Sequence, residues 1–264
     1  MRGNWLLSLC LPLLLAGCVT TTTESGMGDG TGHLPRSSKS DQAEDAARIH
    51  TELGQHYLET GDLQTALNKL TKALQFDPNY APAHTVIAVV YERIKDMPDA
   101  EIHYRRAEEL EPKKGAPNNN LGAFLCRIGK TAESVAYFHK AVADPFYRTP
   151  DVALTNAGIC QIKGGDRAAG EVDLRSALQH NPNNGEALYQ LAKVSYQDND
   201  AFRARAFIQR FDALGRPSPD ALKLGYQIES RLGNKDAALS YRKRLLAQFP
   251  DSEQAHDFDV AARP

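Results

Sequence analysis

The feature that most constrains this chain is a pattern of apolar and small residues that returns every 34 positions. Its first occurrence has a Leu-Gly pair, a tyrosine three positions later, a set of small and apolar residues, and a proline. These residues are Leu53, Gly54, Tyr57, Ala66, Leu70, Ala73 and Pro78. Adding 34 to each number gives Ile87, Ala88, Tyr91, Ala100, Tyr104, Ala107 and Pro112. A repeat of this length predicts stacked helix pairs, because one such pair cannot bury its apolar side alone.

Four more units follow these two. The third keeps the step of 34 but has Phe146 in place of the proline, and the fourth is displaced by two residues. The fifth and sixth are weaker, since Phe211 and Arg244 stand where a small residue is expected. We therefore expect six units within a domain that spans 45–258, followed by a C-terminal tail at 259–264. The expected units are 47–80, 81–114, 115–148, 151–184, 185–217 and 218–251.

Small residues at fixed places in each unit predict a close crossing of its two helices. A larger side chain at Gly54, Ala66 or Ala73 would push the helices apart. Proline at the end of a unit stops the second helix, because it has no backbone N–H to donate. Glycines lie between the paired helices of most units, where a left-handed C-cap is commonly needed. The pattern resembles the tetratricopeptide repeat, which implies an all-α solenoid: a right-handed superhelix of about six antiparallel helix pairs.

Residues 1–17 have the features of an export signal. A single charge at Arg2 precedes a nearly continuous apolar stretch from Trp5 to Leu15. That stretch is shorter than the roughly 20 residues of a membrane-spanning helix. The string LAGC that ends at Cys18 resembles the lipobox of bacterial lipoproteins, which implies cleavage before Cys18 and its acylation by fatty acids such as palmitate. An ordinary secretory signal with an incidental cysteine is the alternative.

The residues after Cys18 predict where the protein is held. Val19 follows the cysteine, and no aspartate resembles an inner-membrane retention signal, so we expect the periplasmic face of the cell outer membrane. Residues 18–44, the acylated N-terminus and a stretch rich in Thr, Gly and Ser, predict a flexible tether. Contact with the membrane is expected through the acyl chains only, each buried methylene contributing about 0.8 kcal/mol.

Two cysteines remain for the repeat domain once Cys10 leaves with the signal and Cys18 is acylated. Cys126 and Cys160 fall near the ends of the first helices of neighbouring units, and such helices lie side by side in a stack. An exported protein meets an oxidising compartment, where disulfides persist. We expect a Cys126–Cys160 disulfide; two reduced, half-buried cysteines are the alternative.

The segment 143–150 adds the two extra residues between units three and four. Its two prolines and two aromatic residues predict an ordered, longer turn packed on the stack. It is either a tolerated insertion or a contact surface for a partner.

Charge and motifs argue against several classes of function. A formal charge of −2 disfavours nucleic acid as a partner, because proteins that bind it usually carry a basic excess. The eight histidines form no His-Glu-x-x-His pattern, and no Cys-x-x-Cys pattern occurs, so we expect no metal. The glycine-rich stretch 26–32 lacks the lysine of a phosphate loop and is better explained as linker. We expect no catalytic residue, no cofactor and no enzymatic activity.

The first helices of a tetratricopeptide stack line its concave face. The resemblance implies that their second, fifth, ninth and twelfth positions, with polar neighbours, point into a partner-binding groove. This rule selects Arg48, Thr51, Gln55, Leu58, Thr85, Val89, Asn119, Ala123, Ile159, Ile162, Tyr189, Lys193, Tyr196, Leu222 and Tyr226. Apolar residues on such a face indicate that a helix or an extended peptide of a partner covers them. Packing against the chain's own tail, or against each other, is the alternative.

Longer strings resemble one family in particular, the type IV pilus biogenesis and stability lipoproteins called PilW or PilF. Besides the lipobox at Cys18, they are AVVY at 88–91, NNLGAFLC at 119–126, DPFYRTP at 144–150, ALTNAGIC at 153–160 and FPDS at 249–252. The resemblance covers nearly the whole mature chain, and two of its strings end at Cys126 and Cys160, which supports their pairing.

This family resemblance implies a non-enzymatic outer-membrane pilotin. Such a protein binds the secretin subunit and promotes its localisation or assembly for type IV pilus biogenesis. The implied partner surface is the groove of the first repeats, here with Leu58 and Val89. We expect a monomer. A periplasmic scaffold for envelope or cell-wall machinery unrelated to pili is the alternative.

Overall fold

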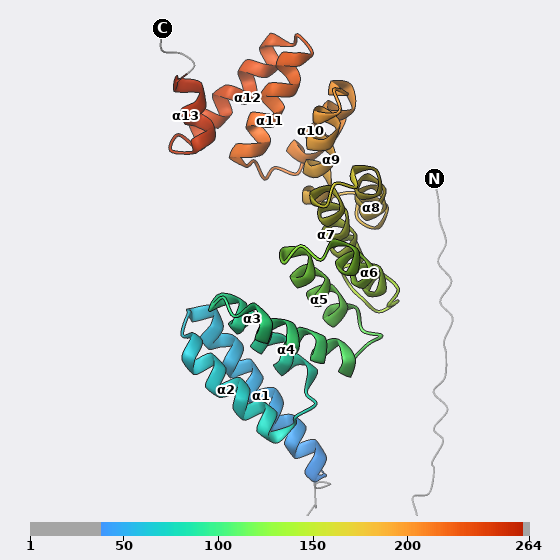
Figure 1. The fold of residues 1–264 in the computed structure, drawn as a ribbon. Coiled ribbons are helices and arrows are strands. Elements are labelled where there is room, and N and C mark those ends of the chain that lie inside the picture. Colours follow the sequence, from blue (N-terminus) through green and yellow to red (C-terminus); the bar gives the residue numbers. More distant parts are fainter. Residues whose placement is uncertain (1–37, 261–264) are drawn as a thin grey trace, which may run out of the picture. The chain divides into compact units, whose positions relative to one another are not determined.

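The computed structural model describes residues 38–260, with side chains up to residue 258. Within that range all regular secondary structure is α-helical, in thirteen helices (Figure 1), which confirms the predicted fold class. The predicted signal peptide, Cys18 and most of the predicted tether lie outside the described residues, as does the end of the predicted tail. None of the described helices is long and apolar enough to cross a membrane.

The first twelve of these helices form six pairs, one for each sequence unit. The pairs are α1 (Lys39–Thr60) with α2 (Leu63–Phe76), α3 (Ala81–Arg93) with α4 (Met97–Leu110), α5 (Gly115–Arg127) with α6 (Thr131–Val142), α7 (Pro150–Lys163) with α8 (Arg167–His180), α9 (Gly185–Gln197) with α10 (Ala201–Asp212), and α11 (Pro219–Arg231) with α12 (Lys235–Gln248). Each pair packs on the next, and the first helices α1, α3, α5, α7, α9 and α11 also contact one another in that order. The first helices therefore form one continuous face.

Paired helices cross closely because small residues lie at the contact. A Cβ added to Gly54 would lie 2.5 Å from Leu70 Cγ, inside the packing distance of two carbon atoms. In the fourth unit both helices contribute a glycine, and a Cβ on Gly158 would lie 2.7 Å from the carbonyl oxygen of Gly170. The glycine that returns in the sequence pattern is therefore a packing requirement.

The turns inside the pairs use a residue in the left-handed region. Gly61 has a φ of 85°, and Gly129, Gly165 and Gly233 occupy the same place in other units. The second and fifth units use Lys95 and Asn199 instead, with φ of 69° and 62°. Since a side chain in this region costs roughly 1–2 kcal/mol, the turn geometry is imposed by the packing of the two helices.

Helix α1 begins at Lys39, so the prediction of a tether as far as residue 44 is wrong for residues 39–44. A capping box starts the helix. The Ser38 hydroxyl accepts the N–H of Asp41 at 3.0 Å, and the Asp41 carboxylate accepts the N–H of Ser38 at 2.9 Å. This first turn is polar, so hydrophobic periodicity gives no sign of it, and the capping residues decide where the helix starts.

A last helix, α13 (Glu253–Val260), follows the sixth pair and packs on α11 and α12. Gln254 donates to Asp220 Oδ1 at 2.7 Å, across a separation of 34 residues. Lys223 pairs with Asp257 across the same separation. The helix therefore lies where the first helix of a seventh unit would lie, and it covers the C-terminal end of the stack, as terminal elements of solenoids do.

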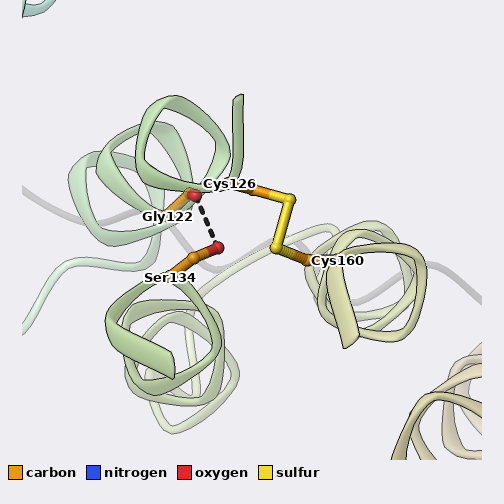
Figure 2. The surroundings of a disulfide bond; sticks show 4 residues. All are labelled: Gly122, Cys126, Ser134 and Cys160. Carbon is orange, nitrogen blue, oxygen red and sulfur yellow. Dashed lines mark hydrogen bonds between the residues drawn. A yellow bond between two sulfur atoms is a disulfide. The ribbon is translucent and has the colours of Figure 1, made fainter. Parts of the chain in front are cut away.

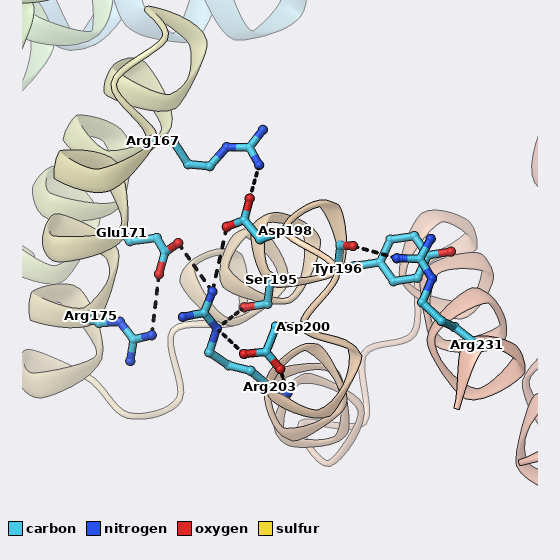
Figure 3. Close-up of polar contacts among 9 residues, drawn as sticks. All are labelled: Arg167, Glu171, Arg175, Ser195, Tyr196, Asp198, Asp200, Arg203 and Arg231. Carbon is cyan, nitrogen blue, oxygen red and sulfur yellow. Dashed lines mark hydrogen bonds and ion pairs between the residues drawn. The ribbon is translucent and has the colours of Figure 1, made fainter. Parts of the chain in front are cut away.

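Ion pairs join the second helices and turns of neighbouring units, and Figure 3 shows the network between the fourth and fifth units. Arg203 of α10 donates to Ser195 Oγ at 3.0 Å and lies 3.7 Å from the carboxylate of Glu171 on α8. On α11, the guanidinium of Arg231 stacks 3.8 Å from the ring centroid of Tyr196. Because these side chains are partly exposed, each pair adds little stability, and the network mainly fixes how neighbouring units meet.

Candidate partner-binding groove

The face made by the first helices is hollowed where α3, α5 and α7 lie side by side. Three clefts occur there, with volumes of about 470, 160 and 200 Å³. The first two share Ala123 and Arg127, and the first and third share Asn120, so the three clefts adjoin and are treated as one groove. We call it the α3–α7 groove. Its main lining residues are Thr85, Val89, Arg93, Asn120, Ala123, Arg127, Asn156, Ile159 and Lys163.

The lining of the groove repeats from helix to helix because it comes from equivalent positions. The ninth position of each unit, counted from Ala81, Gly115 and Asp151, supplies the apolar residues Val89, Ala123 and Ile159, all half-buried. The sixth position supplies the amides Asn120 and Asn156. An apolar strip therefore crosses the three helices, and amides flank it on α5 and α7.

One wall of the largest cleft is held by a carboxylate with two partners. Arg127 donates to both oxygens of Glu92, at 2.8 and 2.6 Å, and so ties α5 to α3. The hydroxyl of Tyr104 on α4 donates to the same carboxylate at 2.6 Å. Burial, and then this hydrogen bond to Glu92, raise the pKa of Tyr104 well above its ordinary value, so the hydroxyl stays protonated and remains a donor.

A disulfide holds α5 and α7 together beside the smallest cleft. Cys126 and Cys160 are bonded, with 5.8 Å between their Cα atoms and a sequence separation of 34 (Figure 2). Cys126 lines the cleft, whereas Cys160 is only 1% exposed. Next to the bond, Ser134 Oγ donates to the carbonyl oxygen of Gly122 at 2.7 Å and closes the contact between α5 and α6. The spacing of the two groove helices is thus fixed covalently.

The turn that interrupts the repeat period is pinned to the start of α5. Asp144 accepts the N–H of Phe146 at 2.9 Å and that of Gly115 at 2.8 Å. These two backbone hydrogen bonds lower the pKa of the Asp144 carboxyl. Tyr147 packs against Gly115, where any Cβ would collide with its ring. Phe146 is left 85% exposed, so the turn is ordered by Asp144 and Tyr147 and presents one aromatic ring to solvent.

Of the predicted groove residues, Thr85, Val89, Ala123 and Ile159 line the α3–α7 groove. Asn119 lies beside it and accepts a hydrogen bond from Asn156 Nδ2 at 3.2 Å. The sequence reasoning missed Asn120 and Asn156, although their return at the sixth position of successive first helices was a readable signal.

In the first unit two predicted groove residues lie in the interior, and their assignment to a binding surface is corrected. Thr51 is 6% exposed, and its hydroxyl donates to the carbonyl of Ala47 at 2.8 Å. Leu58 is 8% exposed and packs in a core cluster with Leu70 and Ile87. Both point inward because α1 packs on α2 and α3 with these positions at its contacts.

The two other predicted groove residues of α1 are exposed. Arg48 pairs with Asp45 at 3.3 Å and with Glu52 at 2.9 Å, and Gln55 donates to Glu59 at 3.1 Å. Their polar groups are therefore already engaged along their own helix.

The predicted aromatic residues of the last units are covered by the chain itself, which corrects their assignment to an open groove. Tyr189 packs on Phe211, with ring centroids 6.0 Å apart, and Tyr196 lies under Arg231. Tyr226 meets the ring of Phe258 edge to face at 4.6 Å, so α13 covers it. These contacts agree with the alternative stated for this face, in which its apolar residues pack against the chain's own tail or against each other.

The last three residues predicted for the groove, Ile162, Leu222 and Lys193, differ in their surroundings. Ile162 contacts the backbone of Gly170, where an added Cβ would lie 2.6 Å from Ile162 Cγ1. Leu222 is buried at 1% exposure in the cluster that α13 covers, and only Lys193 is exposed. Among residues 38–258, no group of three His, Cys, Asp or Glu side chains is placed to hold a metal ion.

Comparison with known proteins places this arrangement in a class. Residues 57–116 match the family model described as tetratricopeptide repeat, and the other helix pairs have the same construction. The chain is thus a tetratricopeptide-repeat protein.

Similarity to individual proteins narrows the class to a family. The chain is 26% identical to the type IV pilus assembly protein PilF of Pseudomonas aeruginosa strain PAO1 over 247 residues, which cover 93% of this chain and 94% of PilF. A crystal structure of PilW, described as a widely conserved type IV pilus biogenesis factor, is 34% identical, with a TM-score of 0.72 over 80% of this chain and 97% of PilW. A structure of Pseudomonas aeruginosa PilF is 25% identical, with a TM-score of 0.73 over 85% of this chain and 100% of that one. The chain belongs to the PilF and PilW family of type IV pilus biogenesis proteins.

Proposed function

We propose that the protein is an outer-membrane lipoprotein that binds the secretin subunit of the type IV pilus machinery and promotes its localisation and assembly. The observation that carries this proposal is the match along 94% of PilF and 97% of PilW, both named for pilus assembly or biogenesis. A match of that extent covers the order of all the units, whereas a single shared repeat would support only a common fold. The protein acts by binding and catalyses no reaction.

The α3–α7 groove supports the binding role. Its apolar strip of Val89, Ala123 and Ile159 is half-exposed and is left uncovered by the chain's own side chains, unlike Tyr226. A groove across several parallel helices suits a segment of partner in an extended or helical form. Because Arg127 and the disulfide fix the helices beforehand, binding requires little ordering of the protein itself.

The anchor in this proposal is Cys18, acylated and inserted in the periplasmic leaflet of the outer membrane. About 20 residues rich in Thr, Gly and Ser lie between it and Ser38 in the sequence, and the tether predicted for them would have a root-mean-square length of about 25 Å. The repeat domain can therefore meet a membrane-bound subunit that stands close to the same surface.

Deleting the gene and measuring secretin multimers tests this function. We expect the deletion to reduce the heat-stable secretin multimers seen on denaturing gels of outer-membrane fractions and to abolish twitching motility, and the wild-type gene should restore both. Cys18→Ser should leave the helical circular dichroism intact but shift the protein out of the outer membrane and lower the multimers. Normal multimers and motility in the deletion strain would refute the secretin role and leave a general envelope scaffold as the explanation.

A groove variant with a matched control tests the site. Ala123 lines two of the three clefts, and Ala123→Gln would fill the groove with a longer side chain. We expect fewer secretin multimers with this variant. Ala132→Gln, at an exposed position of α6 outside the groove, should give wild-type levels. Equal multimer levels in the two variants would remove the groove from the mechanism.

A further inference from the structure

The three groove helices all end in a cation. The last residues of α3, α5 and α7 are Arg93, Arg127 and Lys163, and each lines the groove. A basic residue at a helix C-terminus is favourable by itself, because it interacts with the helix dipole. A terminal cation is not common to all first helices, since α9 ends without one, and Arg231 at the end of α11 lies outside the groove.

Two of the three cations have no partner within the described part of the chain. Arg127 donates hydrogen bonds to both oxygens of Glu92, and the Tyr104 hydroxyl donates to the same carboxylate. Arg93 and Lys163, in contrast, form no ion pair and no side-chain hydrogen bond among residues 38–258. Arg231, the last residue of α11, is satisfied by Tyr196 and Asn199, whereas Lys193 of α9 also has no partner but lies outside the groove. Two unpartnered cations therefore face the groove, one from α3 and one from α7.

The charge of the groove is opposite to that of the protein. The three clefts are lined by four cations, which include Lys95, but by only two carboxylates, Glu92 and Glu111. The whole chain carries a formal charge of −2. A ligand attracted to this face rather than to the rest of the surface is consequently an anionic one.

The amides beside the cations narrow the ligand to a peptide. Asn120 and Asn156 come from equivalent positions of α5 and α7, and each side chain offers both a donor and an acceptor. Asn156 uses one donor on Asn119, and Asn120 has no hydrogen-bond partner among the described residues. An amide pairs with the N–H and C=O of an extended main chain, whereas a phosphate or a lipid headgroup would use only its donor.

We infer that the groove takes an extended, acidic segment of its partner. The main chain of that segment lies along Asn120 and Asn156, its apolar side chains cover Ala123 and the neighbouring strip, and its carboxylates pair with Arg93 and Lys163. This inference specifies the partner chemistry of the site in the proposed function, on which it rests. Direct pairing of carboxylates with cations that already face the groove needs no rearrangement of the helices.

A defined peptide pair tests the inference without using the secretin. The probes are a fluorescein-labelled peptide of four Glu-Leu dipeptides and its Gln-Leu counterpart, titrated with the mature chain carrying Cys18→Ser and followed by fluorescence anisotropy. We expect the acidic peptide to bind at least tenfold more tightly, and its binding to weaken as salt is added. Equal affinity for the two peptides would overturn the inference.

Charge-neutral variants locate the effect. The double variant Arg93→Gln, Lys163→Gln should lower the affinity for the acidic peptide by about tenfold per lost contact. Its affinity for the Gln-Leu peptide should not change. The control Lys235→Gln, Lys243→Gln removes the same charge from exposed positions of α12. Wild-type affinity in the first variant, or an equal loss in both, would overturn the inference. Thermal melts by circular dichroism check the fold, which should be unchanged because neither Arg93 nor Lys163 has a partner to lose.

The two proposals fail in different ways. If the deletion strain keeps normal secretin multimers while the peptide preference holds, the groove chemistry stands and the secretin role falls. If the deletion strain loses its multimers while Arg93→Gln, Lys163→Gln restores them fully and binds both peptides alike, the secretin role stands and the acidic-segment inference falls.

Discussion

Removing the Cys126–Cys160 disulfide should lower the stability of the central units by an amount set by the loop that it closes. The bond joins residues with a sequence separation of 34. Restricting an unfolded loop of that length corresponds to about 3.8 kcal/mol at 25 °C in the chain-entropy model. Because the bond closes this loop in the unfolded chain as well, the reduced protein should unfold at lower denaturant concentration and expose more surface, with a larger m-value.

The assay is urea denaturation of the mature chain carrying Cys18→Ser, followed by circular dichroism with and without a phosphine reductant. In this protein Cys126 and Cys160 are the only cysteines. The variant Cys126→Ala, Cys160→Ala is the control, since it has no disulfide and should not respond to the reductant. Reduction of the parent preserves both sulfur atoms, so its effect excludes the packing lost when the buried Cys160 becomes alanine.

Neighbouring units of a solenoid unfold with limited cooperativity, so the loss should also be local. Hydrogen exchange of backbone amides in α5, α6 and α7 should accelerate on reduction, while α1 and α12 should change little. A difference below about 1 kcal/mol between oxidised and reduced protein, or uniform acceleration along the chain, would refute the loop-closure explanation.

Three further changes test other parts of the structure. Gly158→Ala should cost about 1–3 kcal/mol in urea denaturation, because its Cβ would lie 2.7 Å from a carbonyl oxygen of the paired helix; an unchanged midpoint would contradict the close crossing. Burial lowers the pKa of both His84 and His103 from the ordinary value of 6.5, and their Nδ1 atoms lie 2.9 Å apart. The unfolded chain therefore binds more protons below that pH, and the free energy of unfolding should fall from pH 7 to pH 5, less so in His103→Gln; equal slopes would contradict this. Ala255→Glu would place a charge where no part of the side chain is exposed, so α13 should detach and increase the binding of a hydrophobic dye, unlike His256→Glu at an exposed position.

The sequence allowed the fold to be predicted because the period reflects a packing requirement. Gly54, Gly122 and Gly158 recur since a Cβ at each would enter the partner helix, and this need is the same in every unit. The place of Cys126 and Cys160 on adjacent first helices follows from the same period. The period did not predict features that one local interaction sets, such as the start of α1, which depends on Ser38 and Asp41.

The site was harder to predict, because a position in the repeat gives a direction on an ideal helix but not what lies opposite. Val89 and Tyr226 occupy the same ninth position, yet Val89 lines a cleft and Tyr226 packs against Phe258. The difference comes from α13, which carries no repeat pattern of its own. The predictions for Thr51 and Leu58 were wrong for a similar reason, since both residues lie where α1 packs against the neighbouring helices.

The covered residues also define where the groove ends. Aromatic rings at Tyr189 and Tyr196 are engaged by Phe211 and Arg231, and Tyr226 by Phe258, so the face of α9 and α11 is occupied by the chain itself. Among the described first helices, α3, α5 and α7 line the clefts and keep an apolar strip open in them. Each of these helices ends in a cation that lines the groove, and they are joined by Arg127 or the disulfide. A proposed binding surface confined to three helices, fixed in spacing and positive on an acidic protein, suits a short segment of partner. The one helix pair before it and the two pairs after it hold that surface in place.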